Sequence, residues 1–256
     1  MNGDATVIEL SGMQVTHVDA PGVVLVRDVN WRIERGDFWV VGGREACGKS
    51  SLLQSAAGLN RPVHGTLRIL GQDVATAREK DRVVWRRRAG YVFEQSGRLF
   101  GLLNVAQNIA LPLQYHPGLD EAAIAARVDE LLTLTGLQDY ASLMPSRLGL
   151  SVQQRVGLAR ALASPIDVLF LDNPLSTLSL REARWWLDFL RELQETHRAR
   201  GKPLTLIASG DDFYGWRDIA SHFAVVDDGQ FHAIGGREQL AANAEPVVRD
   251  FLAKEL

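Results

Sequence analysis

The sequence has little of what marks secreted, membrane-spanning or nucleic-acid-binding proteins. Its 256 residues include a single cysteine, Cys47, so no disulfide can form within the chain. No apolar run approaches the roughly 18 to 20 residues that a bilayer-spanning helix needs, and the opening stretch MNGDATVIEL lacks the plan of a signal peptide. With 28 basic and 31 acidic residues the net charge is −3, so no polybasic region for nucleic acid or a membrane surface is expected. These absences favour a reducing, cytoplasmic setting.

The hydrophobic content is high enough for one sizeable core, because 46% of 256 residues are apolar. Short apolar runs alternate with longer helical patterns, which is typical of a mostly parallel sheet covered by helices. The fold class is therefore α/β, and residues 1–256 are expected to form a single domain. Strands are predicted near Val23–Ile33, Phe38–Val41, Thr66–Leu70, Gly90–Phe93, Val168–Asp172, Leu204–Ala208 and Phe223–Val226.

The middle of the chain reads as helix only. Between Phe93 and Val168, apolar residues recur with helical spacing over Glu121–Thr135 and again over Ser151–Ser164. This block predicts a helical subdomain, at about residues 96–165, set into the sheet domain.

The most specific motif is GREACGKS, Gly43 to Ser50, which fits G-x-x-x-x-G-K-[ST] between the strand-like FWVV and the helix start KSSLLQSAA. A plain glycine turn is the alternative, but average composition produces the bare pattern in on the order of one in a hundred chains of this length. In such loops backbone N–H groups surround phosphates, the lysine neutralises the β- and γ-phosphates, and the hydroxyl binds Mg²⁺. The loop is therefore predicted to hold a nucleoside triphosphate. The cofactor-binding residues are Gly43, Arg44, Glu45, Ala46, Cys47, Gly48, Lys49, Ser50 and Ser51.

A second half of such a site is an apolar strand that ends in aspartate, and VLFLD supplies Asp172. Alone, this pattern usually marks only the end of a strand. Together with Lys49 and Ser50 it predicts that Asp172 steadies Mg²⁺, through water. The six histidines show no spacing typical of a zinc site.

With both halves placed, the chain resembles the ATP-binding subunit of ABC transporters over nearly its whole length. Residues 90–113 look like the family's glutamine loop, residues 145–163 like its signature region, and residues 168–178 like its Walker B motif and D-loop. The run QSGRLF…NVAQNIALPL is similar to the lipid-trafficking, Mla-type branch.

The resemblance implies a P-loop NTPase fold with a mostly parallel sheet, an antiparallel β subdomain and an inserted helical subdomain. It also implies a head-to-tail homo- or heterodimer, with ATP between one P-loop and the partner's signature helix. The pair would drive a separate transmembrane permease, with this chain peripheral on the inner face of the membrane. The permease is expected to dock beside Gln95 and the Leu99–Asn108 segment, unless that segment's apolar residues close the helical core.

Several positions depart from the family's pattern. Where the family has LSGGQ, residues 148–152 read LGLSV. Asn173 replaces the glutamate that polarises water, and a carboxamide can orient water but cannot take its proton. Ser179 replaces the D-loop aspartate, and Gly210, interpreted as a turn residue, replaces the switch histidine. We prefer a capping role for Ser151, at the start of a helix, over a phosphate contact.

The glutamine loop offers two side chains, Glu94 and Gln95, where the family has one glutamine. The QSG that follows favours Gln95 as the Mg²⁺ contact. The predicted metal residues are thus Ser50, Gln95 and Asp172, and the predicted catalytic residues are Asn173 and Gln95.

Three smaller features concern the nucleotide cleft. No aromatic residue suited to adenine stacking is present in QVTHVDAPG, where His17 either substitutes or faces solvent. Ala46 replaces a family glycine, which strains the loop. Cys47 lies near a helix N-terminus, which predicts a lowered thiol pKa.

Two functions remain open. The chain is either an ATP-hydrolysing subunit with slow turnover, or a pseudo-ATPase whose nucleotide occupancy regulates or structures a complex.

Overall fold

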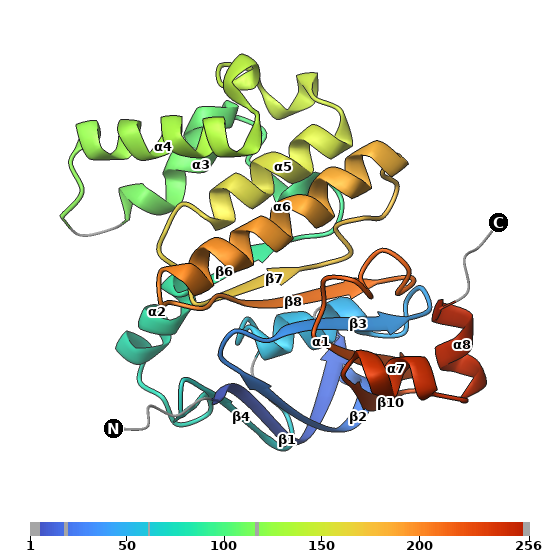
Figure 1. The fold of residues 1–256 in the computed structure, drawn as a ribbon. Coiled ribbons are helices and arrows are strands. Elements are labelled where there is room, and N and C mark those ends of the chain that lie inside the picture. The colour runs from blue at the N-terminus through green and yellow to red at the C-terminus, as the bar shows by residue number, and fades with distance from the viewer. Residues whose placement is uncertain (1–5, 18–19, 61, 116–117, 253–256) are drawn as a thin grey trace.

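A ten-stranded sheet runs through the molecule, in the order β5-β4-β1-β2-β10-β9-β3-β8-β7-β6 (Figure 1). The computed structural model describes residues 6–17, 20–60, 62–115 and 118–252. The strands are β1 (Thr6–His17), β2 (Ala20–Glu34), β3 (Phe38–Gly43), β4 (Thr66–Ile69), β5 (Gln72–Asp73), β6 (Ala89–Val92), β7 (Val168–Leu171), β8 (Thr205–Gly210), β9 (His222–Asp227) and β10 (Gln230–Gly235). The α-helices are α1 (Lys49–Ala56), α2 (Glu79–Arg87), α3 (Val105–Gln114), α4 (Glu121–Thr135), α5 (Leu150–Ala161), α6 (Leu180–Ala199), α7 (Arg237–Ala242) and α8 (Pro246–Leu252).

The sheet has a parallel part and an antiparallel part. Strands β9, β3, β8, β7 and β6 are neighbours that all run parallel. Strand β1 pairs antiparallel with β2 and β4, and β4 with β5. A hairpin of β9 and β10 links the parts through one parallel pairing of Gln230 with Arg27. The predicted mostly parallel sheet is therefore the part that carries the P-loop.

Strand β3 is buried along its whole length because both faces of the sheet are covered. Phe38 and Val40 point to the side of α5 and α6, whereas Trp39 and Val41 belong to the cluster on the side of α1. This alternation is the two-residue period of a strand. Strand β3 therefore anchors the P-loop between two hydrophobic cores.

Strand β1 was not predicted because its two-residue pattern is interrupted. Its pairing register with β2 shifts between Leu10 and Met13, and Gly12 between them has a positive φ of 56°. An irregularity of this kind exchanges which side chains face the core. The sequence pattern therefore reads as neither a clean strand nor a helix.

The segment between β6 and β7 is helical, with α3, α4 and α5 at the top of Figure 1. Helix α4 has the predicted bounds because both of its ends carry local signals. The Asp120 carboxylate accepts a hydrogen bond from the Ala123 N–H at the start, and Gly136 adopts a left-handed conformation at the end.

The predicted capping role of Ser151 is wrong. Helix α5 begins at Leu150, with Gly149 at the N-cap and no side-chain capping bond, so Ser151 lies inside the first turn. A complete capping box forms instead at the start of α6, between Ser179 and Glu182. Ser179, which stands at the D-loop aspartate position, is thus a helix cap.

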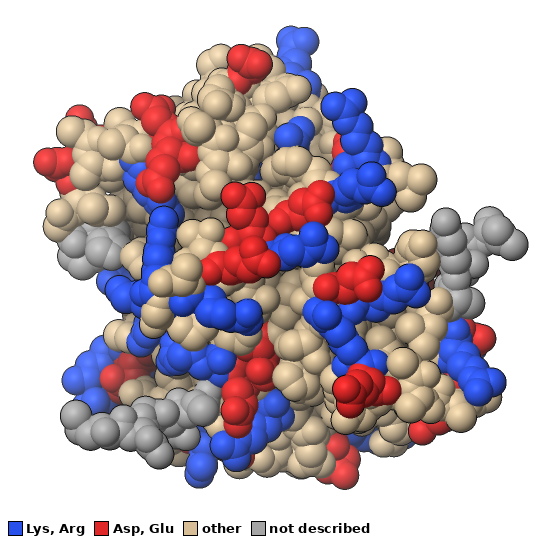
Figure 2. All heavy atoms as spheres, in the orientation of Figure 1, with Lys and Arg blue, Asp and Glu red and all other residues tan. Residues whose placement is uncertain are grey.

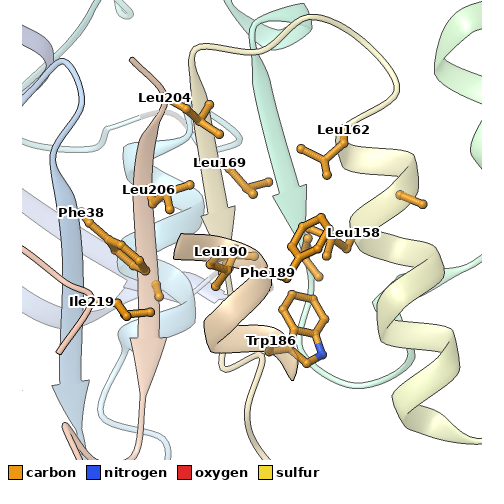
Figure 3. Close-up of a cluster of buried hydrophobic side chains, with 14 of the residues drawn as sticks. Phe38, Leu158, Leu162, Leu169, Trp186, Phe189, Leu190, Leu204, Leu206 and Ile219 are labelled. Carbon is orange, nitrogen blue, oxygen red and sulfur yellow. The ribbon is translucent and has the colours of Figure 1, made fainter. Parts of the chain in front are cut away.

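Helix α6 packs its apolar side against α5 and the sheet (Figure 3). Trp186 and Leu190 are buried to 1% and 0% exposure, and Phe189 lies beside them. Their neighbours in this core are Leu158 of α5, Leu162 at the end of that helix, Leu169 of β7 and Leu206 of β8.

The surface carries both signs of charge. Figure 2 shows basic and acidic side chains interspersed over one face. No helix in the described part of the chain combines the length and apolarity that a bilayer crossing requires.

Replacing Trp186 by alanine is expected to lower the free energy of unfolding by about 3 to 5 kcal/mol, because the indole is fully buried. Leu180→Ala is the matched control on the same helix, since Leu180 is 91% exposed, and should change stability by less than about 0.5 kcal/mol. Urea unfolding of the purified chain, followed by circular dichroism, measures both. Similar losses in the two variants would contradict this account of the core.

Candidate functional site

The P-loop joins the end of β3 to the start of α1 and depends on two glycines. A Cβ at Gly43 would lie 2.6 Å from the Cys47 Sγ and 2.8 Å from the Val226 carbonyl oxygen. Gly48 is the N-cap of α1, with a φ of 107° that L-residues rarely adopt. The loop therefore brings backbone N–H groups to a helix N-terminus, where anions are stabilised.

Lys49 uses all three protons of its ammonium group within the chain. It donates to the carbonyl oxygens of Gly43 and Arg44, the latter at 3.0 Å, and to Asp211 Oδ1 at 3.1 Å. Lys49 is 7% exposed, whereas the Asp211 side chain is 57% exposed. Phosphates that bind Lys49 must therefore replace one of these acceptors, and the exposed Asp211 carboxylate is the one that belongs to a side chain.

Asp172, just after β7, joins three strands of the sheet to α1. Its Oδ1 accepts hydrogen bonds from Ser50 Oγ at 2.9 Å and Ser209 Oγ at 3.0 Å, and its Oδ2 accepts one from Tyr91 OH at 3.3 Å. Burial raises the pKa of Asp172, while the hydrogen bonds from Ser50, Ser209 and Tyr91 and the charge of Lys49 act against that rise. Burial and the Asp172 charge raise the pKa of Tyr91 well above its ordinary value.

Asn173 bridges two carboxylates through one nitrogen. Its Nδ2 donates to Glu94 Oε1 at 2.8 Å and to Asp211 Oδ2 at 2.9 Å. Carboxylates only accept hydrogen bonds, so the amide nitrogen must face both of them. The backbone N–H of Asn173 donates to Ser209 Oγ at 2.9 Å, which ties this bridge to the Asp172 cluster.

These groups open onto one cleft of about 910 Å³. This volume lies within the range of small-molecule sites, and the cleft lies at the carboxyl ends of parallel strands, where ligands bind in α/β folds. All the predicted cofactor-binding residues from Gly43 to Ser51 line it, as do Gln95 and Asn173. Asp172 reaches the same place through its bond to Ser50.

Two acidic residues of the cleft were missed or passed over from the sequence. Asp211 follows β8 just as Asp172 follows β7, so the same pattern of an apolar strand ending near an acid could have identified it. For Glu94, the QSG that follows in the sequence favours its neighbour Gln95 instead. In the structure it is Glu94 that bonds Asn173, while Gln95 is exposed at the cleft with a positive φ of 50°.

Gly210 is not a turn residue, because it is the last residue of β8 and pairs with Gly42 of β3. A Cβ at this position would lie 3.0 Å from the Trp216 Nε1. The close approach of Trp216 therefore favours glycine at this position, where the family's pattern has the switch histidine.

The signature region faces a different cleft. Ser151, Arg155, Ser179 and Trp185 line a second hollow of about 460 Å³, away from the P-loop. Hydrogen bonds from Ser151 and then Ser179 lower the pKa of Glu182 to about 2. Within one chain, therefore, Ser151 binds a carboxylate and does not join the nucleotide cleft.

Cys47 and His17 both line the cleft that contains Lys49. Burial raises the pKa of the Cys47 thiol and outweighs the attraction of Lys49, so the predicted lowering is wrong. Val18 and Asp19, which follow His17 in the stretch searched for an adenine platform, lie outside the described residues.

The residues present fit a hard cation held jointly with phosphates. The Ser50 hydroxyl and the Asp172 carboxylate lie in contact with each other, and both offer oxygen atoms, which are the ligands that Mg²⁺ prefers. Among the described residues, no group of three or more His, Cys, Asp or Glu side chains is placed to hold a metal ion.

Residues 26–176 match the sequence profile of the ABC transporter family. The methionine import ATP-binding protein MetN of Lacticaseibacillus paracasei is 32% identical over 97% of this chain and 69% of its own length. MetN 2 of Burkholderia mallei is 36% identical over 89% of this chain and 56% of its own length. The chain thus spans only part of the length of these relatives.

Solved structures show the same fold. MJ0796, a dimeric bacterial ABC transporter cassette, matches with a TM-score of 0.76 at 25% identity, over 87% of this chain and 95% of that one. The cbiO1 protein of Clostridium perfringens, part of the transporter complex cbiONQ, matches with a TM-score of 0.78 at 23% identity, over 96% and 94%. The predicted fold is confirmed. The finer resemblance to the lipid-trafficking branch is not supported, because these curated relatives are methionine import proteins.

Ala46→Gly should raise the free energy of unfolding by about 0.5 to 1 kcal/mol. Ala46 is exposed and has a φ of 60°, where a Cβ costs energy and no packing is lost on its removal. Ala125→Gly, on the exposed side of α4, is the control and should lower stability by about 1 kcal/mol. Urea titration compares the two, and a loss in both would show that Ala46 is not strained.

Asp211→Asn should strengthen MgATP binding by about fivefold, because the Lys49 ammonium no longer has to leave a carboxylate. The nucleotide-free protein should become slightly less stable. Asp250→Asn removes an exposed charge from the same cleft without a contact to Lys49, and should leave affinity nearly unchanged. Calorimetric titration gives both dissociation constants, and equal effects would mean that only overall charge matters.

Proposed function

This chain belongs to the ABC transporter family, and from that membership we propose that it is the ATP-binding subunit that drives a separate membrane permease. The single observation that carries the proposal is the contact of Ser50 with Asp172 beside Lys49. That arrangement offers a cation for phosphates and two oxygens for a metal in one cleft.

In this proposal residues 43–51 hold the phosphates through their backbone N–H groups and Lys49. Ser50 and Asp172 hold Mg²⁺, with the glutamine loop at Gln95 beside them. Mg²⁺ supplies positive charge to the phosphates and favours the ionised form of Asp172, against the burial that raises its pKa. The degenerate positions at 148–152, 173, 179 and 210 concern turnover more than binding.

We propose that the working unit is a head-to-tail dimer with a second ATP-binding domain. Support comes from the separation of the two clefts, since Ser151 and Arg155 line one and Lys49 the other. A signature helix that cannot reach its own P-loop is available to that of a partner. Leu150 and Leu180 add exposed apolar side chains beside the second cleft, 53% and 91% accessible.

The permease would dock at the loop before α3. Phe100 and Leu102 are 55% and 89% exposed there, while Leu99 packs against the core. The buried Asn108 amide holds this loop, accepting from the Phe100 N–H and donating to the carbonyl oxygens of Phe100 and Leu103. The loop thus presents two apolar side chains on a fixed backbone, which suits a protein interface.

Localisation follows from this docking, with the chain held on the inner face of the membrane by its partner. Residues 1–256 would act as one ABC-type domain whose helical subdomain, at about 96–165, carries the docking loop. Methionine import is a property of the relatives. Here we propose that the permease selects the substrate.

Millimolar MgATP is expected to raise the melting temperature of the purified chain by several degrees, because ligand binding stabilises the folded state. Lys49→Ala should abolish the shift, whereas Lys202→Ala, an exposed lysine outside the cleft, should preserve it. Chelation of Mg²⁺ should reduce the shift. Absence of any shift in the parent chain would refute ATP binding.

A further inference from the structure

We propose that Glu94 is the carboxylate that takes the proton of the attacking water when this site hydrolyses ATP, with Asn173 as its positioning residue. The inference rests on the proposed function, since it requires that ATP binds in the Lys49 cleft. Its basis is the 2.8 Å hydrogen bond from Asn173 Nδ2 to Glu94 Oε1.

Hydrolysis of a phosphoanhydride needs a group that orients water and receives its proton. Asn173 cannot receive the proton, because a carboxamide is too weak a base. Both of its side-chain N–H bonds are already directed at carboxylates. Asp172 is occupied by three hydroxyl donors on the metal side of the cleft. The base must therefore come from another acid of the cleft.

The described residues place four further carboxylates around the cleft, at Glu45, Glu94, Asp211 and Asp250. Glu45 on the P-loop and Asp250 on α8 are both exposed to solvent. Asp211 bonds Lys49, so it occupies the place that the phosphates take and is repelled as they enter. Glu94 is half-buried and bonded to Asn173, so it is the carboxylate that stays when Asp211 leaves.

Asn173 gives Glu94 a fixed position relative to the metal side of the cleft. The Asn173 backbone N–H is held by Ser209 Oγ, which itself donates to Asp172. Hydrogen bonds made by the side chain and backbone of Asn173 therefore connect the Glu94 carboxylate, through Ser209, to the pair of Asp172 and Ser50. Such preorganisation is what a proton acceptor at a hydrolytic site requires.

The water oxygen forms a bond to the γ-phosphorus, and the bond from that phosphorus to the β,γ-bridging oxygen breaks, so that ADP leaves with the electron pair. The water proton passes to the Glu94 carboxylate and is later released to solvent. Neither an oxidant nor a further co-reactant is needed.

The test compares isosteric variants of the protein, assayed as the proposed dimer, under single-turnover conditions with the protein in excess over MgATP and well above its dissociation constant. Glu94→Gln should lower the rate by on the order of 10²-fold or more, because the base is lost. The ATP dissociation constant should change less than about twofold, since Glu94 does not contact the phosphate loop. Asp250→Asn is the matched control from the same cleft and should keep the parent rate.

An exchange variant separates a chemical role from a structural one. In Glu94→Gln with Asn173→Glu the same hydrogen bond is reversed, so that the amide lies on the β6 side and the carboxylate follows β7. This double variant should recover at least a tenth of the parent rate. Asn173→Glu alone should not match the parent, because three carboxylates then converge at residues 94, 173 and 211.

A measurement without nucleotide checks the contact itself. Glu94→Ala and Asn173→Ala should lower the urea midpoint by amounts that do not add in the double variant, as expected for contacting groups. Additive shifts would contradict the bond on which the inference rests.

The other outcomes are distinguishable. Bound MgATP with no turnover in the parent, or an unchanged rate in Glu94→Gln, overturns the inference and leaves ATP binding intact. Loss of turnover in Asp211→Asn but not in Glu94→Gln assigns the base to Asp211 instead. Absence of binding by the parent refutes the proposed function and this inference together.

Discussion

The structure depends above all on the burial of one carboxylate, that of Asp172, at the carboxyl ends of the parallel strands. A buried charge is costly unless hydrogen bonds satisfy it. The three donors come from Ser50 on α1, Tyr91 on β6 and Ser209 on β8, so that satisfying Asp172 fixes the P-loop helix against three strands. The same requirement places two oxygen atoms where a metal bound to phosphate would lie.

A second constraint is the balance of charge deeper in the cleft. One ammonium group, at Lys49, and one amide, at Asn173, hold the carboxylates of Glu94 and Asp211. Every proton of the two donors is used, so incoming phosphate must displace one of their acceptors, among which Asp211 is the most exposed carboxylate. An acid at position 173 would add a third negative charge without a donor. The amide at position 173 and the carboxylate at position 94 therefore depend on each other, because Asn173 donates the hydrogen bond that Glu94 accepts.

The proposed dimer rests on the separation of two hollows in the surface. Ser151 and Arg155 line a hollow that does not communicate with Lys49, and Ser179 is used as a helix cap. The signature region and the P-loop thus lie on two separate parts of the surface. A second domain is the simplest way to bring them together.

The sequence by itself determined the features that are encoded locally: the P-loop, the apolar strand before Asp172, and both ends of α4. Each is specified by residues within one turn or strand, so pattern and spacing suffice. Tertiary structure decided which side chains meet across strands. The hydrogen bond of Asn173 to Glu94, the ion pair of Asp211 with Lys49, and the raised pKa of Cys47 depend on strand order and burial. No local pattern records these, because register and burial arise only when distant segments pack.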